Sequence, residues 1–309
     1  MKKFDLVGNR HIKEAAQRGA LGSAVIFDGP AGSGKKAAAA YAAAALLCRA
    51  DDPQRRPCGV CPSCIQADIG SNPDIIFFNK AGENIKVNDV RTLRMQSFIV
   101  PSQSPFKVFI INRADLMNQE AQNAMLKVLE EPVSSVFILL TENASSLLQT
   151  VRSRCRIYAM EALQPGDIGQ WLEEHYAKNG KRADKKAMSD AAASCGGCIG
   201  RAMALVENTA TKAMQLADAF VKSLHGGALE VMETCLKASG LSRAEYGDLY
   251  TEITRRLVRL AVAEPDRASY YAAVYDYIQR QNDRLVDNNA SVFALSSQLA
   301  AFCGTLYRR

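Results

Sequence analysis

The stretch of residues 118–155 decides the fold, and it reads NQEAQNAMLKVLEEP, VSSVFILLTENASSLLQT and VRSRC. Apolar residues recur every three or four positions in its first piece, which predicts a helix with one apolar face. Pro132 should end this helix, because proline lacks the N–H that a continuing helix needs. Residues 136–140 form an unbroken apolar run, typical of a strand covered on both faces. The basic segment 152–154 follows, and we expect it on a loop that can present a cation outside the core.

The length and charge of the chain limit its number of domains and its possible partners. The chain has 309 residues, too many for one ordinary core, which predicts two or three domains. Its net charge of +6 permits an acidic partner such as nucleic acid, but a solvated surface with extra lysines explains it better. The N-terminal segment lacks the apolar core of a signal peptide, and no segment has the apolar length that spans a bilayer. We therefore expect a cytoplasmic protein with no membrane partner.

A glycine-rich loop, GPAGSGKK at residues 29–36, follows a predicted strand at residues 24–27 and precedes an alanine-rich helix. Backbone N–H groups of such a loop can turn towards phosphate oxygens, and the helix N-terminus adds positive potential. Lys35 would reach the outer phosphates. The candidate phosphate-binding residues are Gly29, Gly32, Gly34 and Lys35.

The residues that would bind magnesium in a hydrolytic phosphate loop are missing. Lys36 stands where a Ser or Thr would ligate the ion, and a charged lysine has no lone pair to offer. After the predicted strand at residues 107–111, Asn112 and Arg113 stand where an acidic pair is expected. These losses indicate a site that does not hydrolyse ATP. Binding of ATP or ADP, and a turn that binds nothing, both remain open.

Four cysteines lie close together in the sequence. A tight run of three at two-residue gaps, with a fourth at the end of the preceding helix, suits a tetrahedral structural zinc site. The alternative is a set of reduced thiols, but the compact spacing favours zinc. A closed shell of four sulfurs leaves no position for catalysis, so the ion would fold an insertion at residues 48–64. The candidate metal ligands are Cys48, Cys58, Cys61 and Cys64.

Strands and helices alternate through the first half of the chain. Residues 74–78 read as another buried strand, and Asn88 or Asp89 can cap a helix that follows it. This alternation predicts an α/β fold with a mostly parallel sheet that is covered by helices on both faces.

Together, these motifs resemble the bacterial DNA polymerase III clamp-loader subunits of the AAA+ class, and most closely the delta-prime branch. The motifs are the loop 29–35, the four cysteines, the run NAMLKVLEEP at 123–132 and the triplet SRC at 153–155. The resemblance is dense over residues 1–160, recognisable to about 207 and weak beyond. Motor subunits of the family keep the magnesium Ser/Thr and the acidic pair, and this chain keeps neither.

The resemblance implies three domains. Residues 1–160 would form the AAA+ module with its zinc-binding insertion, 161–207 a small helical lid, and 208–309 an all-α collar that packs subunits into a ring. Thr141 and Glu142 lie where the family's first nucleotide sensor would be, and Glu142 would be a poor phosphate sensor. Near the second sensor, Gly200 takes the place usual for arginine and Arg201 follows it, so we assign sensing to neither.

The resemblance also implies a function. Arg154, beside Ser153, would be an arginine finger that projects into the nucleotide site of a neighbouring subunit. The chain would have no activity of its own as a subunit of the DNA-directed DNA polymerase III holoenzyme. Its partners would be the delta and gamma/tau subunits in a hetero-pentamer, and through the complex the sliding clamp and primed DNA. From the residues alone, an arginine that caps the preceding helix or pairs with a local carboxylate is the simpler alternative.

Two other functions remain open. One is an active ATPase, like the gamma/tau motor subunits, with an atypical nucleotide site. The other is a separate zinc-containing DNA-binding module, which would bind DNA tightly without partners and with a steep salt dependence.

The remaining segments give weaker signals. Ile168, Leu172 and Tyr176, together with Trp171, have helical spacing. The sequence CGGC at 195–198 is better explained as a glycine turn between helices than as a redox motif. Only helices are predicted beyond residue 209. There we expect the tyrosines to pack between helices and the arginines to lie on a solvated helix face. These residues are Tyr270, Tyr271, Tyr275, Tyr277, Arg255, Arg256 and Arg259.

Overall fold

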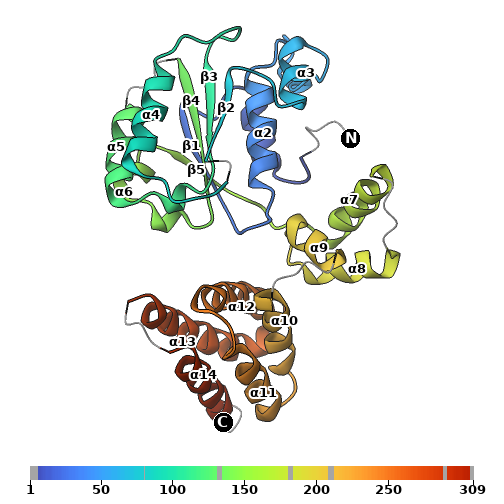
Figure 1. Ribbon diagram of the computed structural model, residues 1–309. Coiled ribbons are helices and arrows are strands. Elements are labelled where there is room, and N and C mark those ends of the chain that lie inside the picture. Colours follow the sequence, from blue (N-terminus) through green and yellow to red (C-terminus); the bar gives the residue numbers. More distant parts are fainter. Residues whose placement is uncertain are drawn as a thin grey trace. The chain divides into compact units, whose positions relative to one another are not determined.

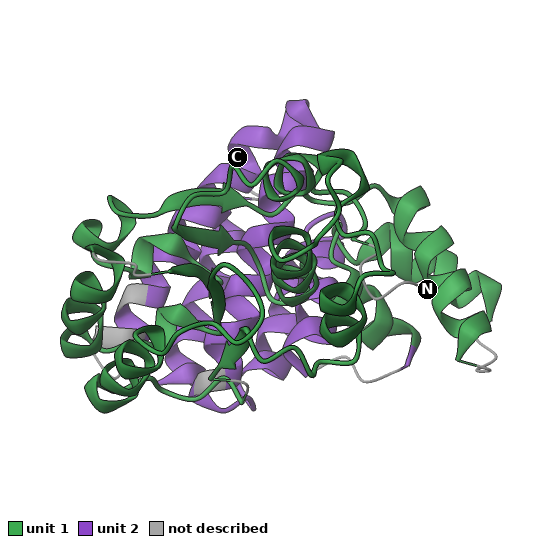
Figure 2. Cartoon of the chain, turned by 90° about the horizontal axis from the view of Figure 1, so that it is seen from above, with its two compact units in different colours: residues 1–206 green, residues 207–309 purple. Residues whose placement is uncertain are grey.

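A computed structural model describes residues 6–79, 81–130, 134–179, 184–207, 212–287 and 291–306. The chain divides into two compact units, Met1–Val206 and Glu207–Arg309, which Figure 2 colours green and purple. Each unit has hydrophobic clusters of its own. The first unit carries all of the candidate site residues.

The first unit is built on one five-stranded sheet in which all neighbouring strands are parallel. The strands are β1 (Ala24–Asp28), β2 (Ile75–Phe78), β3 (Lys107–Ile111), β4 (Ser135–Thr141) and β5 (Arg156–Ala159). Their order is β2-β3-β4-β1-β5, so that β1, which leads into the glycine-rich loop, pairs with both β4 and β5. The expected α/β fold of the AAA+ class is confirmed.

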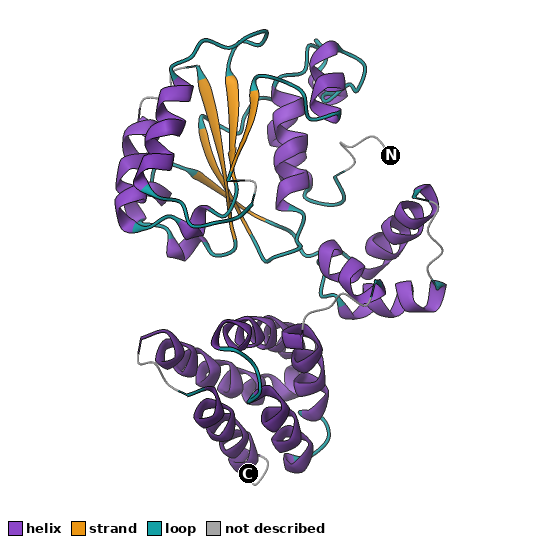
Figure 3. Cartoon of the chain, viewed as in Figure 1, coloured by secondary structure: helices purple, strands orange, loops and turns teal. Residues whose placement is uncertain are grey.

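Helices cover both faces of this sheet (Figures 1 and 3). One layer contains α1 (Arg10–Gln17) and α2 (Lys35–Leu46), and the other contains α4 (Val87–Ser97), α5 (Gln119–Glu130) and α6 (Gln149–Arg152). Side chains of a strand alternate between its two faces. Along β1, Val25 and Phe27 therefore pack with the first layer, whereas Ala24 and Ile26 pack with the second. The apolar run of this strand is explained by burial on both sides.

More than half of the helix after the glycine-rich loop is buried. In α2, seven of twelve residues are buried, and six of these are alanines. Alanine favours helix and is small, so the helix can lie close to the sheet without the crowding of larger side chains. This packing fixes the position of Gly34 and Lys35, which begin the helix.

Two features of the sheet differ from the sequence expectation. β2 is an edge strand, so its four residues are only half-buried rather than buried on both faces. β5 was not expected, because its sequence RIYA is short and mixes polar and apolar residues. It pairs in parallel with β1, and of its residues only Tyr158 is buried.

Two predictions concerned the ends of helices. Lys86, rather than Asn88 or Asp89, is the N-cap of α4. Asp89 lies in the first turn, where its carboxylate accepts a 2.8 Å hydrogen bond from the backbone N–H of Lys86. The prediction that Pro132 ends the preceding helix falls outside the described residues, and α5 is described as far as Glu130.

Three helices complete the first unit: α7 (Pro165–Lys178), α8 (Lys185–Ser194) and α9 (Ile199–Val206). Ile168, Leu172 and Tyr176 are buried in their core, as the helical spacing predicted. Between α8 and α9, Gly196 and Gly197 have φ values of 72° and 78°, a conformation that favours glycine. Cys195 and Cys198, which flank them, are buried. The glycine turn expected there is present.

The second unit is entirely helical over its described residues. Its helices are α10 (Lys212–Ser223), α11 (Ala228–Ala238), α12 (Arg243–Ala263), α13 (Ala268–Asp287) and α14 (Val292–Leu306). The remaining short elements of the chain are α3 (Pro62–Asp68) and the 3-10 turns η1 (Pro53–Arg55), η2 (Ala114–Leu116), η3 (Ala144–Ser146) and η4 (Pro265–Arg267). In the described part of the chain, no helix has both the length and the apolar character needed to cross a bilayer.

In the second unit, the tyrosines pack as predicted, but one of the arginines is more buried than predicted. Tyr271 is fully buried, and the other three tyrosines pack against the same core, as predicted. Arg256 contradicts the prediction of a solvated face, because it is only 8% exposed. Its guanidinium forms ion pairs with Asp218 at 2.8 Å and with Glu252 at 3.0 Å. Buried charge requires such partners, which sequence spacing alone did not reveal.

Candidate functional site

The glycine-rich loop connects β1 to α2. Gly32 and Gly34 have φ values of 77° and 90°, so the loop uses backbone conformations that other residues rarely adopt. Lys35, the first residue of α2, turns back over the loop. Its Nζ donates hydrogen bonds to the carbonyl oxygens of Gly29 at 2.5 Å and Pro30 at 2.8 Å. The loop therefore has the backbone turn predicted from its glycines.

Lys35 is a largely buried cation. Burial lowers its pKa, because the charged form loses water, while the nearby carboxylates of Glu142, Asp115 and Asp28 and the thiol of Cys198 act to raise it. Its ammonium group therefore lies in a partly desolvated place with carboxylates nearby.

Arg113 occupies the place beside Lys35 where the sequence lacked an acidic pair. It has a left-handed backbone conformation with φ of 54° and lies two residues after the end of β3. Its guanidinium pairs with Asp115 at 2.9 Å and with Glu142 at 3.4 Å, and Asp115 also accepts a 3.3 Å hydrogen bond from the backbone N–H of Glu142. Two carboxylates are thus present after all, but both are bound to an arginine.

Sequence reasoning missed Asp115 as a site residue and treated Glu142 only as a poor sensor. The two are 27 positions apart, at the ends of β3 and β4. Because the carboxyl ends of adjacent parallel strands meet at one edge of the sheet, their proximity could have been expected from the strand assignments.

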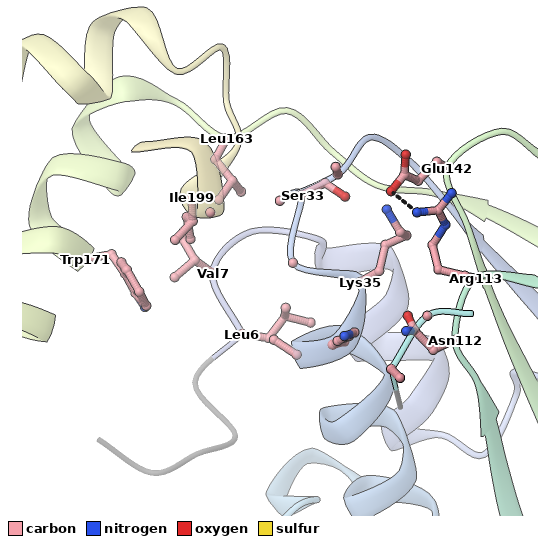
Figure 4. Close-up of a pocket in the computed structure, with 18 residues that line it drawn as sticks. Leu6, Val7, Ser33, Lys35, Asn112, Arg113, Glu142, Leu163, Trp171 and Ile199 are labelled. Atoms are coloured by element: carbon pink, nitrogen blue, oxygen red, sulfur yellow. Dashed lines mark ion pairs between the residues drawn. The ribbon is translucent and has the colours of Figure 1, made fainter. Parts of the chain in front are cut away.

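A cavity of about 620 Å³ opens beside the loop (Figure 4). Lys35, Lys36 and Arg113 line one part of it. Apolar side chains from the N-terminal segment and from the α7–α9 bundle line another part. They are Leu6, Val7, Leu163, Trp171 and Ile199. A volume of this size is within the usual range for a small-molecule site.

The α7–α9 bundle touches the loop through two glycines. The backbone N–H of Gly200 donates a 3.0 Å hydrogen bond to the carbonyl oxygen of Gly32. A Cβ atom on Gly200 would lie 2.8 Å from the Cα of Gly32, closer than real Cβ atoms come. The glycine at this position therefore allows the loop and α9 to touch, and an arginine in its place would require the two to separate.

Ser33 lies inside the loop and is 5% exposed. Its hydroxyl oxygen is buried and has no hydrogen-bond partner among the described residues, although the side chain lines the cavity. A buried hydroxyl without a partner is costly, which marks this atom as available to a ligand.

Arg154 follows α6 and lies at the surface, where its side chain is 37% exposed. Its guanidinium donates to the carbonyl oxygen of Thr150 at 3.0 Å and to the carboxylate of Glu130 at 2.5 Å. Within this chain, then, it both caps the preceding turn and pairs with a local carboxylate. Ser153 donates from its hydroxyl to Thr150 at 3.0 Å and closes the end of α6.

The four candidate metal ligands come together as predicted. The sulfurs of Cys48, Cys58, Cys61 and Cys64 all lie within 4.8 Å of one another. Four thiolates around zinc, at about 2.3 Å from the ion, would be about 3.8 Å apart, so a small contraction would complete the shell. Tetrahedral coordination by sulfur favours zinc over hard cations. The residues present fit a structural zinc ion.

Backbone groups support this cluster. The N–H of Cys58 donates to the sulfur of Cys48, and the N–H of Cys61 donates to the sulfur of Cys58, both at 3.3 Å. Burial acts to raise the pKa of Cys58, but backbone hydrogen bonds and neighbouring thiols outweigh it and lower the pKa to about 6. Donors to sulfur stabilise the thiolate form that binds metal and orient it.

The parallel sheet, the glycine loop at the start of α2 and the adjoining cavity define a P-loop protein of the AAA+ type. The chain belongs to the family described as DNA polymerase III, delta subunit, whose match covers residues 8–164, just over half of the 309 residues.

Several similar proteins are DNA polymerase III subunits. The gamma/tau subunit of Mycobacterium tuberculosis is 34% identical over 168 residues, which is 52% of this chain and 29% of the relative. The tau subunit of Escherichia coli is 30% identical over 247 residues, covering 76% of this chain and 38% of the relative. This chain thus spans well under half the length of either. The structure of a gamma subunit-related protein from Thermotoga maritima is 19% identical, covers 97% of this chain and 99% of its own, and has a TM-score of 0.42.

Proposed function

We propose that this chain is a non-hydrolysing clamp-loader subunit of the delta-prime kind, which supplies Arg154 to the nucleotide site of a neighbour. In a hetero-pentamer with delta and gamma/tau subunits, it would help to place the sliding clamp on primed DNA in the cytoplasm. One observation carries the non-hydrolysing role. Arg113 binds both carboxylates beside Lys35, at 2.9 and 3.4 Å, so neither is available to hold magnesium or to polarise an attacking water.

The surface position of Arg154 supports its role in trans. Its pair with Glu130 is exposed at both partners, 37% and 48%, and such pairs contribute about 1 kcal/mol or less. The guanidinium can therefore exchange Glu130 for phosphoryl oxygens of a neighbouring subunit at little cost. Because guanidinium is always charged and forks onto two oxygens, it suits that task.

The absence of hydrolysis gives the first prediction. The isolated chain, repurified to remove contaminating ATPases, should release no phosphate from ATP above the protein-free rate at any magnesium concentration. The physical reason is that Lys36 cannot ligate magnesium and that neither Asn112 nor Arg113 supplies a carboxylate base. Phosphate release is measured across a magnesium titration. Turnover that survives repurification and disappears in Lys35→Ala would contradict the proposal.

An active ATPase is the second candidate, and a specific observation favours it. Asp115 and Glu142 are carboxylates close to Lys35, and each would become available if Arg113 moved aside. Turnover in the same assay, lost on replacing Glu142 by glutamine, would establish this function instead.

The ion pair of Arg154 gives a second prediction. Glu130→Gln removes the charge of the local partner while keeping its size, so in an assembled loader ATP turnover should remain at least as high as wild type. The melting temperature should change by less than about 4 °C, because the exposed pair stabilises the fold only weakly. Glu120→Gln, at an exposed position on the same helix, is the matched control. A large loss of turnover in Glu130→Gln alone would mean that Glu130 orients the finger and is not exchanged.

The domain organisation remains part of this proposal. We infer an AAA+ module at residues 1–160 with a zinc-folded insertion at 48–64, a lid at 161–207 and a collar at 208–309. The bundle α7–α9 and its contact with the glycine loop support the assignment of a lid.

A further inference from the structure

One part of the cavity beside the glycine loop is lined by cationic side chains. Lys35 and Lys36 line it, together with Arg113. The pairing of Arg113 with Asp115 and Glu142 uses both carboxylates, and Asp28 accepts a 2.9 Å hydrogen bond from the backbone N–H of Ala144. Among the described residues, neither Lys35 nor Lys36 forms an ion pair with a carboxylate, and Lys35 donates to two backbone carbonyl oxygens.

The same part of the cavity offers neutral donors. The first N–H groups of a helix have no acceptor within it, and α2 is a twelve-residue helix whose first turn begins at Lys35. The hydroxyl of Ser33 adds a buried donor without a partner among the described residues. Donors and cations converge here as a phosphate chain requires.

The residues at the start of α2 do not suit a divalent metal ion. Lys36 stands at the second position of α2, where a hydroxyl would ligate magnesium, and an ammonium group both lacks a lone pair and repels the ion. With a stem of four methylene groups, its charge can instead reach phosphate oxygens directly. One ammonium would then supply part of the charge neutralisation that magnesium supplies in a hydrolytic site.

The apolar part of the cavity indicates more than inorganic phosphate. Leu6, Val7 and Trp171 offer a surface on which a planar base can be buried, at the side of the cavity formed by the N-terminal segment and α7 (Figure 4). Stacking of a base on an aromatic side chain adds affinity of about 1–3 kcal/mol.

We propose that this cavity binds a nucleoside di- or triphosphate without a divalent metal ion, with Lys36 in the place of the metal and Ser33 and the N-terminus of α2 as donors. The nucleotide would be a bound structural ligand that stabilises the existing contact between α9 and the loop at Gly200, and it would not be turned over. This inference concerns the chain's own pocket and does not depend on the role of Arg154 in trans.

The test uses the isolated full chain. Trp171 is the only tryptophan of the sequence and lines the cavity, so its fluorescence reports directly on this site. ADP, ATP and pyrophosphate are titrated with EDTA and, separately, with excess magnesium, and calorimetry gives the dissociation constants. We expect ADP or ATP to bind in EDTA at least as tightly as in magnesium, to change Trp171 fluorescence, and to bind at least tenfold more tightly than pyrophosphate.

A charge variant tests the assignment of Lys36. Lys36→Gln removes the charge while keeping a polar side chain only one atom shorter, and it should weaken metal-free binding about tenfold. Lys127→Gln, at an exposed lysine on α5 away from the cavity, should leave binding unchanged. Melting curves check that both variants fold. Binding only in the presence of magnesium, equal binding of pyrophosphate and ADP, or no binding at all would each overturn the proposal. None of these outcomes bears on Arg154, which is tested in the assembled loader.

Discussion

Replacing Arg154 by alanine should reduce the rate of ATP hydrolysis at the neighbouring subunit's site by about a thousandfold or more, the usual contribution of an arginine finger. In a loader reconstituted with all of its subunits, the DNA- and clamp-stimulated turnover should fall by the share of that site. The stability of the chain should change little, because Arg154 is 37% exposed and its contacts in the described part of the chain are two local ones, with Thr150 and Glu130. Phosphate release is measured after size-exclusion chromatography has confirmed an intact complex.

Two matched variants make this result specific. Arg154→Lys keeps the charge but loses the forked guanidinium, so it should recover only part of the rate. Arg156→Ala removes an arginine two positions away that donates to the carbonyl oxygen of Ala20 within this chain, and it should leave turnover unchanged. If Arg154→Ala gave an intact complex with wild-type turnover, Arg154 would be a structural residue, and the contribution of this subunit would reduce to scaffolding.

Loss of the four-sulfur cluster should have the largest effect on stability. Cys64 is fully buried, and Cys64→Ser should abolish stoichiometric zinc binding and lower the melting temperature of the chain. Structural zinc sites can contribute folding free energy of about 10 kcal/mol or more, and the segment from Cys48 to Cys64 has little apolar core to replace it. Metal content by mass spectrometry and thermal unfolding, with and without a zinc chelator, measure both effects.

A buried cysteine elsewhere separates metal loss from the cost of a buried hydroxyl. Cys303 is fully buried in the second unit, and Cys303→Ser should be destabilising yet retain one zinc per chain. The zinc assignment fails if the wild-type chain, purified in zinc-containing reducing buffer, binds no metal, or if Cys64→Ser keeps both its metal and its stability.

Local sequence patterns predicted much of the first unit. The apolar run of β4, the glycine turn before α2 and the spacing of the four cysteines each depend on neighbours within a few positions. These local patterns are reliable because each structure requires particular residue types. A strand buried on both faces needs apolar residues, a left-handed turn favours glycine, and a metal knuckle needs ligands at fixed spacing.

The edge strands of the sheet and the ion-pair partners of buried charges were less predictable from the sequence. The half-buried state of β2 and the presence of β5 follow from strand order, which local pattern does not contain. The burial of Arg256 depends on Asp218, 38 positions away, because the carboxylate of Asp218 offsets the free-energy cost of burying the guanidinium charge.

The sequence by itself determined the α/β class, the phosphate loop without its magnesium ligand, the cysteine cluster and the surface arginine of the triplet SRC, because each is a matter of residue type and local spacing. Only the tertiary structure revealed that Arg113 holds Asp115 and Glu142, that Glu130 holds Arg154, and that Gly200 rests on Gly32. These contacts join residues from different strands and helices. The parallel strands bring their carboxyl ends to one edge of the sheet. This arrangement determines which charged side chains form ion pairs, and therefore which ligands the pocket can bind.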